Sequence, residues 1–311
     1  MGSLEPPLPR GYLPRLLFLS SLWGASYLFI KVAVREMEPA AMMSLRLLLA
    51  ASVLAAVLVS QMGWRPAVAA VRATGHHGVV LGVINGAVPF WLIAWGEKHI
   101  DSGIAAIANS TVPIFVALLA VRLRPSERPP GLRLAGILVG LAGVAVLSGL
   151  HPEGGRWAVA GTLAVVLSSL FYARANLYTQ EHFAQTRPLV TATAALVTGA
   201  IVILPFGLLQ LPEEVPSWKA FGSIAALGVG GTAIASLVLY RMLTTYGSSR
   251  TTLVTYLLPA FALFYGAVLL DEPLTVNAFA GLVLILAGVA LGSGLLRLSR
   301  RRGAVPAALE P

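Results

Sequence analysis

The chain has 311 residues, of which 57% are hydrophobic and only 11% are charged, and its formal net charge is +9. With a mean hydropathy of +0.81, it has too little polar surface to cover a water-soluble globule of this size, so the composition indicates an integral membrane protein. The basic residues lie in short groups between apolar runs of about 20 residues, the length that crosses a bilayer, and this pattern argues against nucleic-acid binding. The sequence has no cysteine, which excludes disulfides and thiolate metal sites.

The segment 1–14 is rich in proline and carries Arg10, which is typical of a cytoplasmic tail. The apolar runs that follow lack the alternation of a β-barrel, and backbone in lipid must satisfy its own hydrogen bonds. We therefore predict an all-α integral membrane protein with ten transmembrane helices and a second cytoplasmic tail, 298–311. The predicted helices lie at about residues 15–34, 39–60, 77–96, 102–121, 131–150, 157–178, 188–210, 219–240, 249–270 and 275–296.

The second half of the chain repeats features of the first half. Three glycines of the fifth predicted helix recur at a constant offset in the tenth: Gly136 as Gly281, Gly143 as Gly288 and Gly149 as Gly294. This pattern indicates two repeats, 15–150 (helices one to five) and 157–297 (helices six to ten). Because each repeat has an odd number of spans, the second copy enters the membrane from the opposite side, so the repeats are inverted.

Arginine and lysine are unevenly shared between the two sets of predicted helix ends. One set holds most of the arginines, and the other holds only Lys31, Arg35, Lys98, Arg156 and Lys219. The positive-inside rule then places both termini in the cytoplasm of a multi-pass protein of the plasma (inner) membrane. Two inverted halves can rock between inward-open and outward-open shapes, so the symmetry favours an alternating-access transporter for a small-molecule substrate.

Several short motifs also resemble a known family. They are Leu22-Trp23-Gly24-Ala25-Ser26-Tyr27, Val112-Pro113-Ile114-Phe115, Leu258-Pro259-Ala260-Phe261 and the Leu-Ala-Gly-Val strings that end both repeats. Together they resemble the EamA-type members of the drug/metabolite transporter superfamily over about residues 15–297. The resemblance implies a ten-helix exporter or exchanger with a central cavity lined from both repeats. It also implies substrates that range from amino acids to nucleotide-like metabolites and drugs.

Arg46 is the one ionisable residue placed well inside a predicted span. Its counterpart in the second repeat, near Ala195, is uncharged, which favours recognition of a substrate carboxylate or phosphate over a packing role shared by both repeats. The alternative is an arginine that extends toward the interface or bonds carbonyls at a helix end.

Aromatic and amide side chains are the other candidates for substrate binding. Trp23 and Tyr27 share one face of the first helix, and Tyr172 and Tyr256 provide aromatic groups in the second repeat. Such residues suit a flat or apolar solute, although they also serve as packing in membrane helices. The amides of Asn85 and Asn109 must face protein or a wet cavity, because burial in hydrocarbon without partners is costly. Interhelical hydrogen bonds would account for these two amides equally well.

Three prolines lie inside predicted spans. Pro89, Pro113 and Pro259 each remove a backbone hydrogen bond and allow a bend, so they are candidate gate hinges or static kinks. Glycine-rich stripes such as Gly136-xxx-Gly140 let helices approach closely, which suits scaffold packing or a homodimer contact within the membrane lipid.

The acidic residues all fall in predicted loops or at predicted span ends, including Glu97 and Asp101, and no histidine lies at a predicted midplane. No proton relay is therefore expected, and we predict export or exchange of amino-acid-like or aromatic metabolites, or drugs, with little dependence on a proton gradient. The same distribution argues against an intramembrane enzyme, and we expect no cofactor or metal site. A lipid flippase remains a further alternative.

Overall fold

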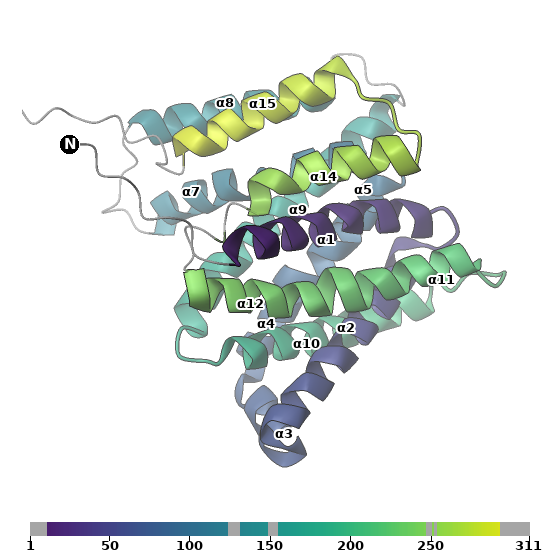
Figure 1. Cartoon of the computed structure of the whole chain (residues 1–311), viewed down its shortest axis with the longest axis vertical. Helices are drawn as coiled ribbons and strands as arrows, with labels where there is room; N and C mark the ends of the chain where they lie inside the picture. Colours follow the sequence, from purple (N-terminus) through teal and green to yellow (C-terminus); the bar gives the residue numbers. More distant parts are fainter. Residues whose placement is uncertain (1–10, 124–130, 149–154, 247–250, 252–253, 293–311) are drawn as a thin grey trace, which may run out of the picture.

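A computed structural model describes residues 11–123, 131–148, 155–246, 251 and 254–292 (Figure 1). Within these residues every regular element is helical. The elements are α1 (Tyr12–Ala33), α2 (Pro39–Met62), α3 (Trp64–Ala73), α4 (Gly75–Gly82), η1 (Val83–Ala87), α5 (Val88–Glu97), α6 (Ser102–Asn109), α7 (Val112–Leu123), α8 (Gly131–Ser148), α9 (Gly155–His182), α10 (Pro188–Leu208), α11 (Trp218–Ala225), η2 (Ala226–Ile234), α12 (Ala235–Tyr246), α14 (Val254–Leu269) and α15 (Val276–Gly292). The two η elements are π-helices. The predicted tails 1–14 and 298–311 lie almost wholly outside the described residues.

Six helical segments are long and apolar enough to cross a membrane. They are Tyr12–Ala33, Pro39–Met62, Gly75–Glu97, Gly155–His182, Pro188–Leu208 and Trp218–Leu239. Shorter apolar helices at Ser102–Val116, Ala135–Leu147, Val254–Leu269 and Val276–Leu291 fall where the other four spans were predicted. The structure thus confirms an all-α, multi-pass membrane protein, while the count of ten transmembrane helices stays a prediction.

Two predicted spans are not continuous α-helices. The span predicted at 77–96 contains the π-helix η1, and the one at 102–121 is divided between α6 and α7. A proline follows each irregularity: Pro89 in the first turn of α5 and Pro113 in the first turn of α7. Because proline has no N–H, the carbonyls of Asn85 and Asn109 lose their usual helical partners. This loss accounts for the local change in both helices.

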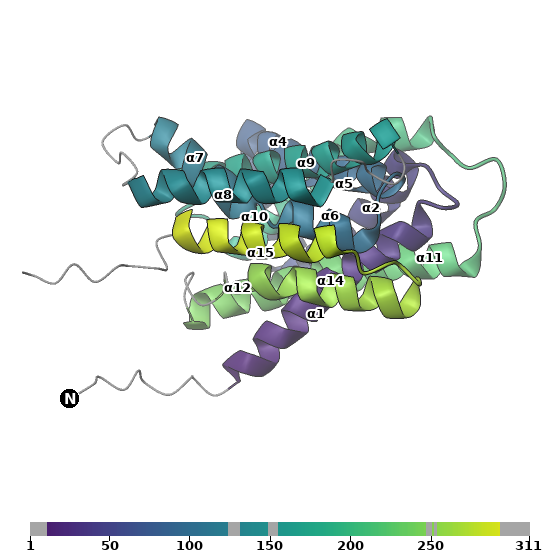
Figure 2. The same ribbon diagram turned by 90° about the horizontal axis from the view of Figure 1, so that it is seen from above.

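The most closely packed helix pairs join the two predicted repeats. In each of the pairs α8 with α15, α2 with α10, α1 with α14 and α5 with α9, one helix comes from residues 15–150 and the other from residues 157–297. Figures 1 and 2 both show α8 beside α15. Neither half is therefore a separate body, and the interior of the bundle lies between the repeats.

Glycine permits the closest of these contacts. A Cβ atom added to Gly288 of α15 would lie 2.5 Å from the backbone nitrogen of Gly140 and 2.6 Å from the carbonyl oxygen of Gly136, both on α8. Any side chain at this position would force the two backbones apart. The glycine stripe predicted from the sequence is thus used for packing inside the chain, and a homodimer contact stays a prediction.

Candidate functional site

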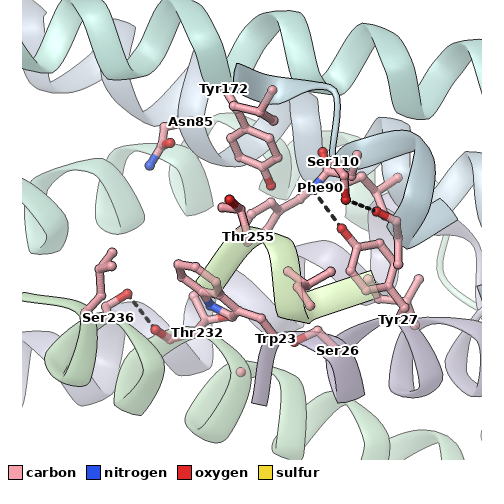
Figure 3. Close-up of a pocket in the computed structure, with 18 of the residues that line it drawn as sticks. Trp23, Ser26, Tyr27, Asn85, Phe90, Ser110, Tyr172, Thr232, Ser236 and Thr255 are labelled. Carbon is pink, nitrogen blue, oxygen red and sulfur yellow. Dashed lines mark hydrogen bonds between the residues drawn. The ribbon is translucent and has the colours of Figure 1, made fainter. Parts of the chain in front are cut away.

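A cavity of about 310 Å³ lies between the two repeats and is lined from both (Figure 3). Its wall includes residues of α1, α2, η1, α5, α6 and α7 from the first repeat and of α9, α10, η2, α12 and α14 from the second. No side chain that the structure describes on α8 or α15 contributes to the wall. The volume is at the lower end of the range typical of sites for small organic ligands.

Arg46 reaches this cavity from α2 and is only 6% exposed. Its Nε donates a 3.0 Å hydrogen bond to Oγ1 of Thr232 in η2, and its guanidinium carbon lies 4.0 Å from the centre of the Phe90 ring. Among the described residues no carboxylate forms an ion pair with it. The protein therefore holds the guanidinium by a neutral hydroxyl and an aromatic face, which leaves its charge available to an anionic group.

The two π-helices occupy matching places in the repeats and both reach the cavity. Asn85 lines it from η1 of the third predicted span, and Gly231 and Thr232 line it from η2 of the eighth. The hydroxyl of Thr232 accepts from Arg46 and itself donates to the carbonyl of Leu227, five residues back, at 2.8 Å. A π-helix leaves backbone carbonyls off the regular ladder, where side chains can bond them, and such turns are frequent at functional sites.

Asn109 is at the centre of a hydrogen-bond network at the break between α6 and α7. Its Nδ2 donates to the Tyr27 hydroxyl at 2.8 Å, and its Oδ1 accepts from Ser169 at 3.1 Å and from Ser168 at 3.5 Å. The backbone carbonyl that Pro113 leaves without a helical partner also accepts from Ser169, at 3.3 Å. The Asn109 amide is thus mainly occupied in joining α1, α6 and α9, although the residue also lines the cavity.

The structure brings most of the sequence-predicted site residues together and leaves one out. The residues that line the cavity are Trp23, Tyr27, Arg46, Asn85, Asn109 and Tyr172. Figure 3 shows Tyr172 and Asn85 on one side of the space and Trp23 on the other. Tyr256 is not in the cavity wall, which takes Thr255 and Leu258 from the same helix instead. The reason is the rotation of α14, which directs the neighbouring residues inward and packs Tyr256 against the apolar core.

Several lining residues were missed by the sequence interpretation. Phe90, Asn176 and Ser236 all border the cavity. Phe90 follows Pro89 directly, and its ring also packs edge-on against Tyr172 with centroids 6.4 Å apart. Asn176 lies two residues before the predicted end of the sixth span, at 178, whereas α9 continues to His182 and places it farther from the helix end. Its position four residues after Tyr172 places both on the same face of α9 and was the available signal.

The predicted hinge prolines all lie at or near this space. Pro113 lines the cavity, Pro89 lies in the first turn of α5 immediately before Phe90, and Pro259 is inside α14 beside Leu258. Their role as hinges stays a prediction. The cavity wall as described contains no His, Asp or Glu, and no group of three or more potential metal ligands occurs in the described part of the chain.

A multi-pass helical bundle that encloses a solute-sized cavity, with a buried guanidinium in its wall, has the architecture of a membrane transporter. The EamA-like transporter family matches the chain over residues 15–149 and again over 159–294. The chain therefore belongs to the EamA-like transporter family. Both matched segments fall within the two repeats inferred from the sequence.

Individual relatives agree with this membership. An "Uncharacterized transporter" of Archaeoglobus fulgidus is 30% identical over 276 residues, which cover 86% of this chain and 94% of that protein. A "Probable amino-acid metabolite efflux pump" of Salmonella typhimurium is 28% identical over 279 residues, covering 86% and 90%. One crystal structure of a protein matches with a TM-score of 0.63 at 19% identity, covering 92% of this chain and 97% of that one, which shows a shared fold.

Proposed function

We propose that this protein exports or exchanges small organic metabolites that combine an anionic group with an apolar or aromatic part. The observation that carries the proposal is Arg46, a cavity residue whose guanidinium has no carboxylate partner among the described residues. Trp23 and Tyr172 supply aromatic surface around it, and Asn85 supplies an amide. A carboxylate on Arg46 with a side chain against the rings is the chemistry of an apolar or aromatic amino acid.

The name of the Salmonella typhimurium relative, an efflux pump for amino-acid metabolites, is consistent with this substrate class. The proposed mechanism is alternating access between two inverted repeats, with both termini in the cytoplasm. It is supported by the helix pairs that join the repeats and by the matching π-helices at the cavity wall. An intramembrane enzyme is not favoured, because the described wall holds no acid or histidine to transfer a proton.

Counterflow in proteoliposomes tests the proposal. Vesicles loaded with unlabelled phenylalanine should accumulate radiolabelled phenylalanine transiently, whereas phenethylamine, which lacks the carboxylate, should not compete. Arg46→Gln removes the charge, and loss of a charge-assisted contact of about 1.5–3 kcal/mol weakens binding about 10- to 150-fold. Arg46→Lys keeps the charge but loses the two-pronged geometry, so it should be intermediate.

Arg65→Gln is the matched control, because Arg65 is an exposed arginine on α3, a helix that does not line the cavity. Equal transport by the parent and Arg46→Gln at equal membrane abundance would show that Arg46 is structural. Failure of every amino acid in a labelled panel, together with movement of a fluorescent phospholipid between leaflets, would favour the lipid-flippase alternative.

A further inference from the structure

Glu97 is a buried acid whose carboxyl group the structure leaves without a hydrogen-bond partner. It ends α5, close to the span end predicted from the sequence, but it is 0% exposed. Neither Oε1 nor Oε2 has a hydrogen-bond partner among the described residues. Glu97 is thus at a helix end, as predicted, and yet enclosed, and the transport cavity does not account for it, because Glu97 is not in the cavity wall.

Lys31 is the neighbouring cation, yet it bonds the backbone and not the carboxylate. Its Nζ donates to the carbonyl oxygen of Glu97 at 2.8 Å and to that of Ile100 at 2.7 Å. These carbonyls lie at the C-terminal end of α5, where a cation is favoured by the helix dipole. Lys31 and the Glu97 carboxylate form no ion pair within 4.0 Å.

Charged and titratable side chains on other elements interact with Glu97 electrostatically. They are Lys31 and Tyr27 of α1, Arg46 of α2 and Glu272 of the segment after α14. On α9, Gly161 and Val165 meet Gly96 beside it, and neither titrates. The sequences of η1 and α6 contain no Asp, Glu, His, Lys, Arg or Tyr. An ionised carboxylate enclosed without hydrogen bonds is strongly disfavoured, so the neutral acid is the form that fits this packing.

Glu97 lies at one end of the bundle, which we call the Lys31 end. It carries the α1–α2 and α14–α15 connections, at the right of Figure 1, and the α5–α6 connection that Lys31 bonds. A side chain of the second repeat bonds the first repeat at this end: Glu272 accepts hydrogen bonds from the N–H and hydroxyl of Ser102, at 2.8 and 2.7 Å. Ile93, one helical turn before Glu97, borders the cavity. Glu97 is thus one helical turn beyond the cavity, toward the Lys31 end.

We propose that Glu97 is a proton-binding site that controls access to the cavity from the Lys31 end. This end is closed when Glu97 is neutral, and opening it exposes the carboxyl group to water, where it ionises. Alkaline conditions then favour opening and acid favours closure. Glu97 is not in the cavity wall, so the proposal gives its proton no route through the cavity and lets it exchange with the solution at the Lys31 end. The proton thus sets the balance between the two access states without being transported, in agreement with the prediction of little gradient dependence.

The absence of cysteine from the chain permits a direct test. Ala33, the last residue of α1, is 0% exposed, whereas Val215 in the connection before α11 is 89% exposed. Single variants Ala33→Cys and Val215→Cys are reacted with a maleimide in nanodiscs between about pH 6 and pH 9. Dividing the first rate by the second corrects for the general rise of thiol reactivity with pH. We expect this ratio to rise about tenfold toward alkaline pH.

Glu97→Gln should keep the labelling ratio low at every pH, since glutamine resembles the neutral acid. Glu213→Gln is the control and should keep the pH profile of the parent, because Glu213 is an exposed carboxylate in the connection before α11. An infrared C=O band of a protonated carboxylic acid should be present in the parent at neutral pH and lost in Glu97→Gln. Its presence in the parent tests for the neutral acid even if the Glu97→Gln variant folds poorly. A flat ratio in the parent, an unchanged profile in Glu97→Gln or absence of the band would overturn the inference. The inference rests on the two access states of the proposed function. The labelling assay needs no substrate, however, so a failure of the phenylalanine assay leaves this test intact.

Discussion

Replacing Glu272 with alanine should release the Lys31 end of the bundle. Its carboxylate accepts from the N–H of Ser102 at 2.8 Å, from the Ser102 hydroxyl at 2.7 Å and from the N–H of Gly103 at 3.2 Å. These groups form the first turn of α6, which lies in the other repeat from Glu272. Gly266 leaves room for the contact, since a Cβ atom added there would lie 2.3 Å from Oε2 of Glu272. The side chain therefore both caps a helix and joins the repeats.

The size of the effect follows from these three bonds. A hydrogen bond to a charged group contributes about 1.5–3 kcal/mol, and an N-cap contributes about 1 kcal/mol. Glu272 is only partly buried, and its three bonds share one carboxylate, so we assign about 2 kcal/mol to the whole contact. Losing it should raise the ratio of open to closed molecules about 30-fold.

Maleimide labelling of Ala33→Cys, relative to Val215→Cys, measures this ratio directly. Glu272→Ala should accelerate labelling about 30-fold at fixed pH when opening is rare in the parent. Glu272→Gln should have a smaller effect, because its amide oxygen can still accept from Ser102. Glu214→Gln, an exposed carboxylate in the connection before α11, is the control. Unchanged or slower labelling in Glu272→Ala would refute the idea that this contact holds the two repeats together.

Two further predictions concern stability. Hydrogen bonds from the hydroxyl and backbone N–H of Ser217 lower the pKa of Glu36 from its ordinary value of 4.5. A carboxyl group with a lowered pKa stabilises the fold above pH 4.5, and this stability is lost as the pH falls through the depressed value. The melting temperatures of the parent and Glu36→Gln should therefore converge in acid. A difference that stays constant with pH would contradict this. Asn109→Ala removes the bond to Tyr27 and should lower the free energy of unfolding by about 1–3 kcal/mol in detergent, whereas Ser52→Ala, an exposed site that bonds its own helix, should change little. Equal losses in both variants would count against the network.

The amino-acid sequence by itself determined that this is a helical membrane protein. Apolar runs separated by short charged segments require helices wherever they cross lipid, because each backbone group must then be paired within its own segment. The offset glycines indicated two repeats, and Arg46 was recognisable as the one ionisable residue well inside a predicted span. These features depend on local composition and spacing, which the sequence displays directly.

The tertiary structure decided which face of each helix meets which neighbour. Successive residues of an α-helix are rotated by about 100°, so a small difference in how α14 is seated brings Thr255 to the cavity and keeps Tyr256 from it. The same applies to Glu97, which the sequence places at a helix end but which the packing of α5 against α1 and α9 encloses completely. Helix rotation is set by contacts between residues far apart in the chain, and no local pattern in one sequence records it.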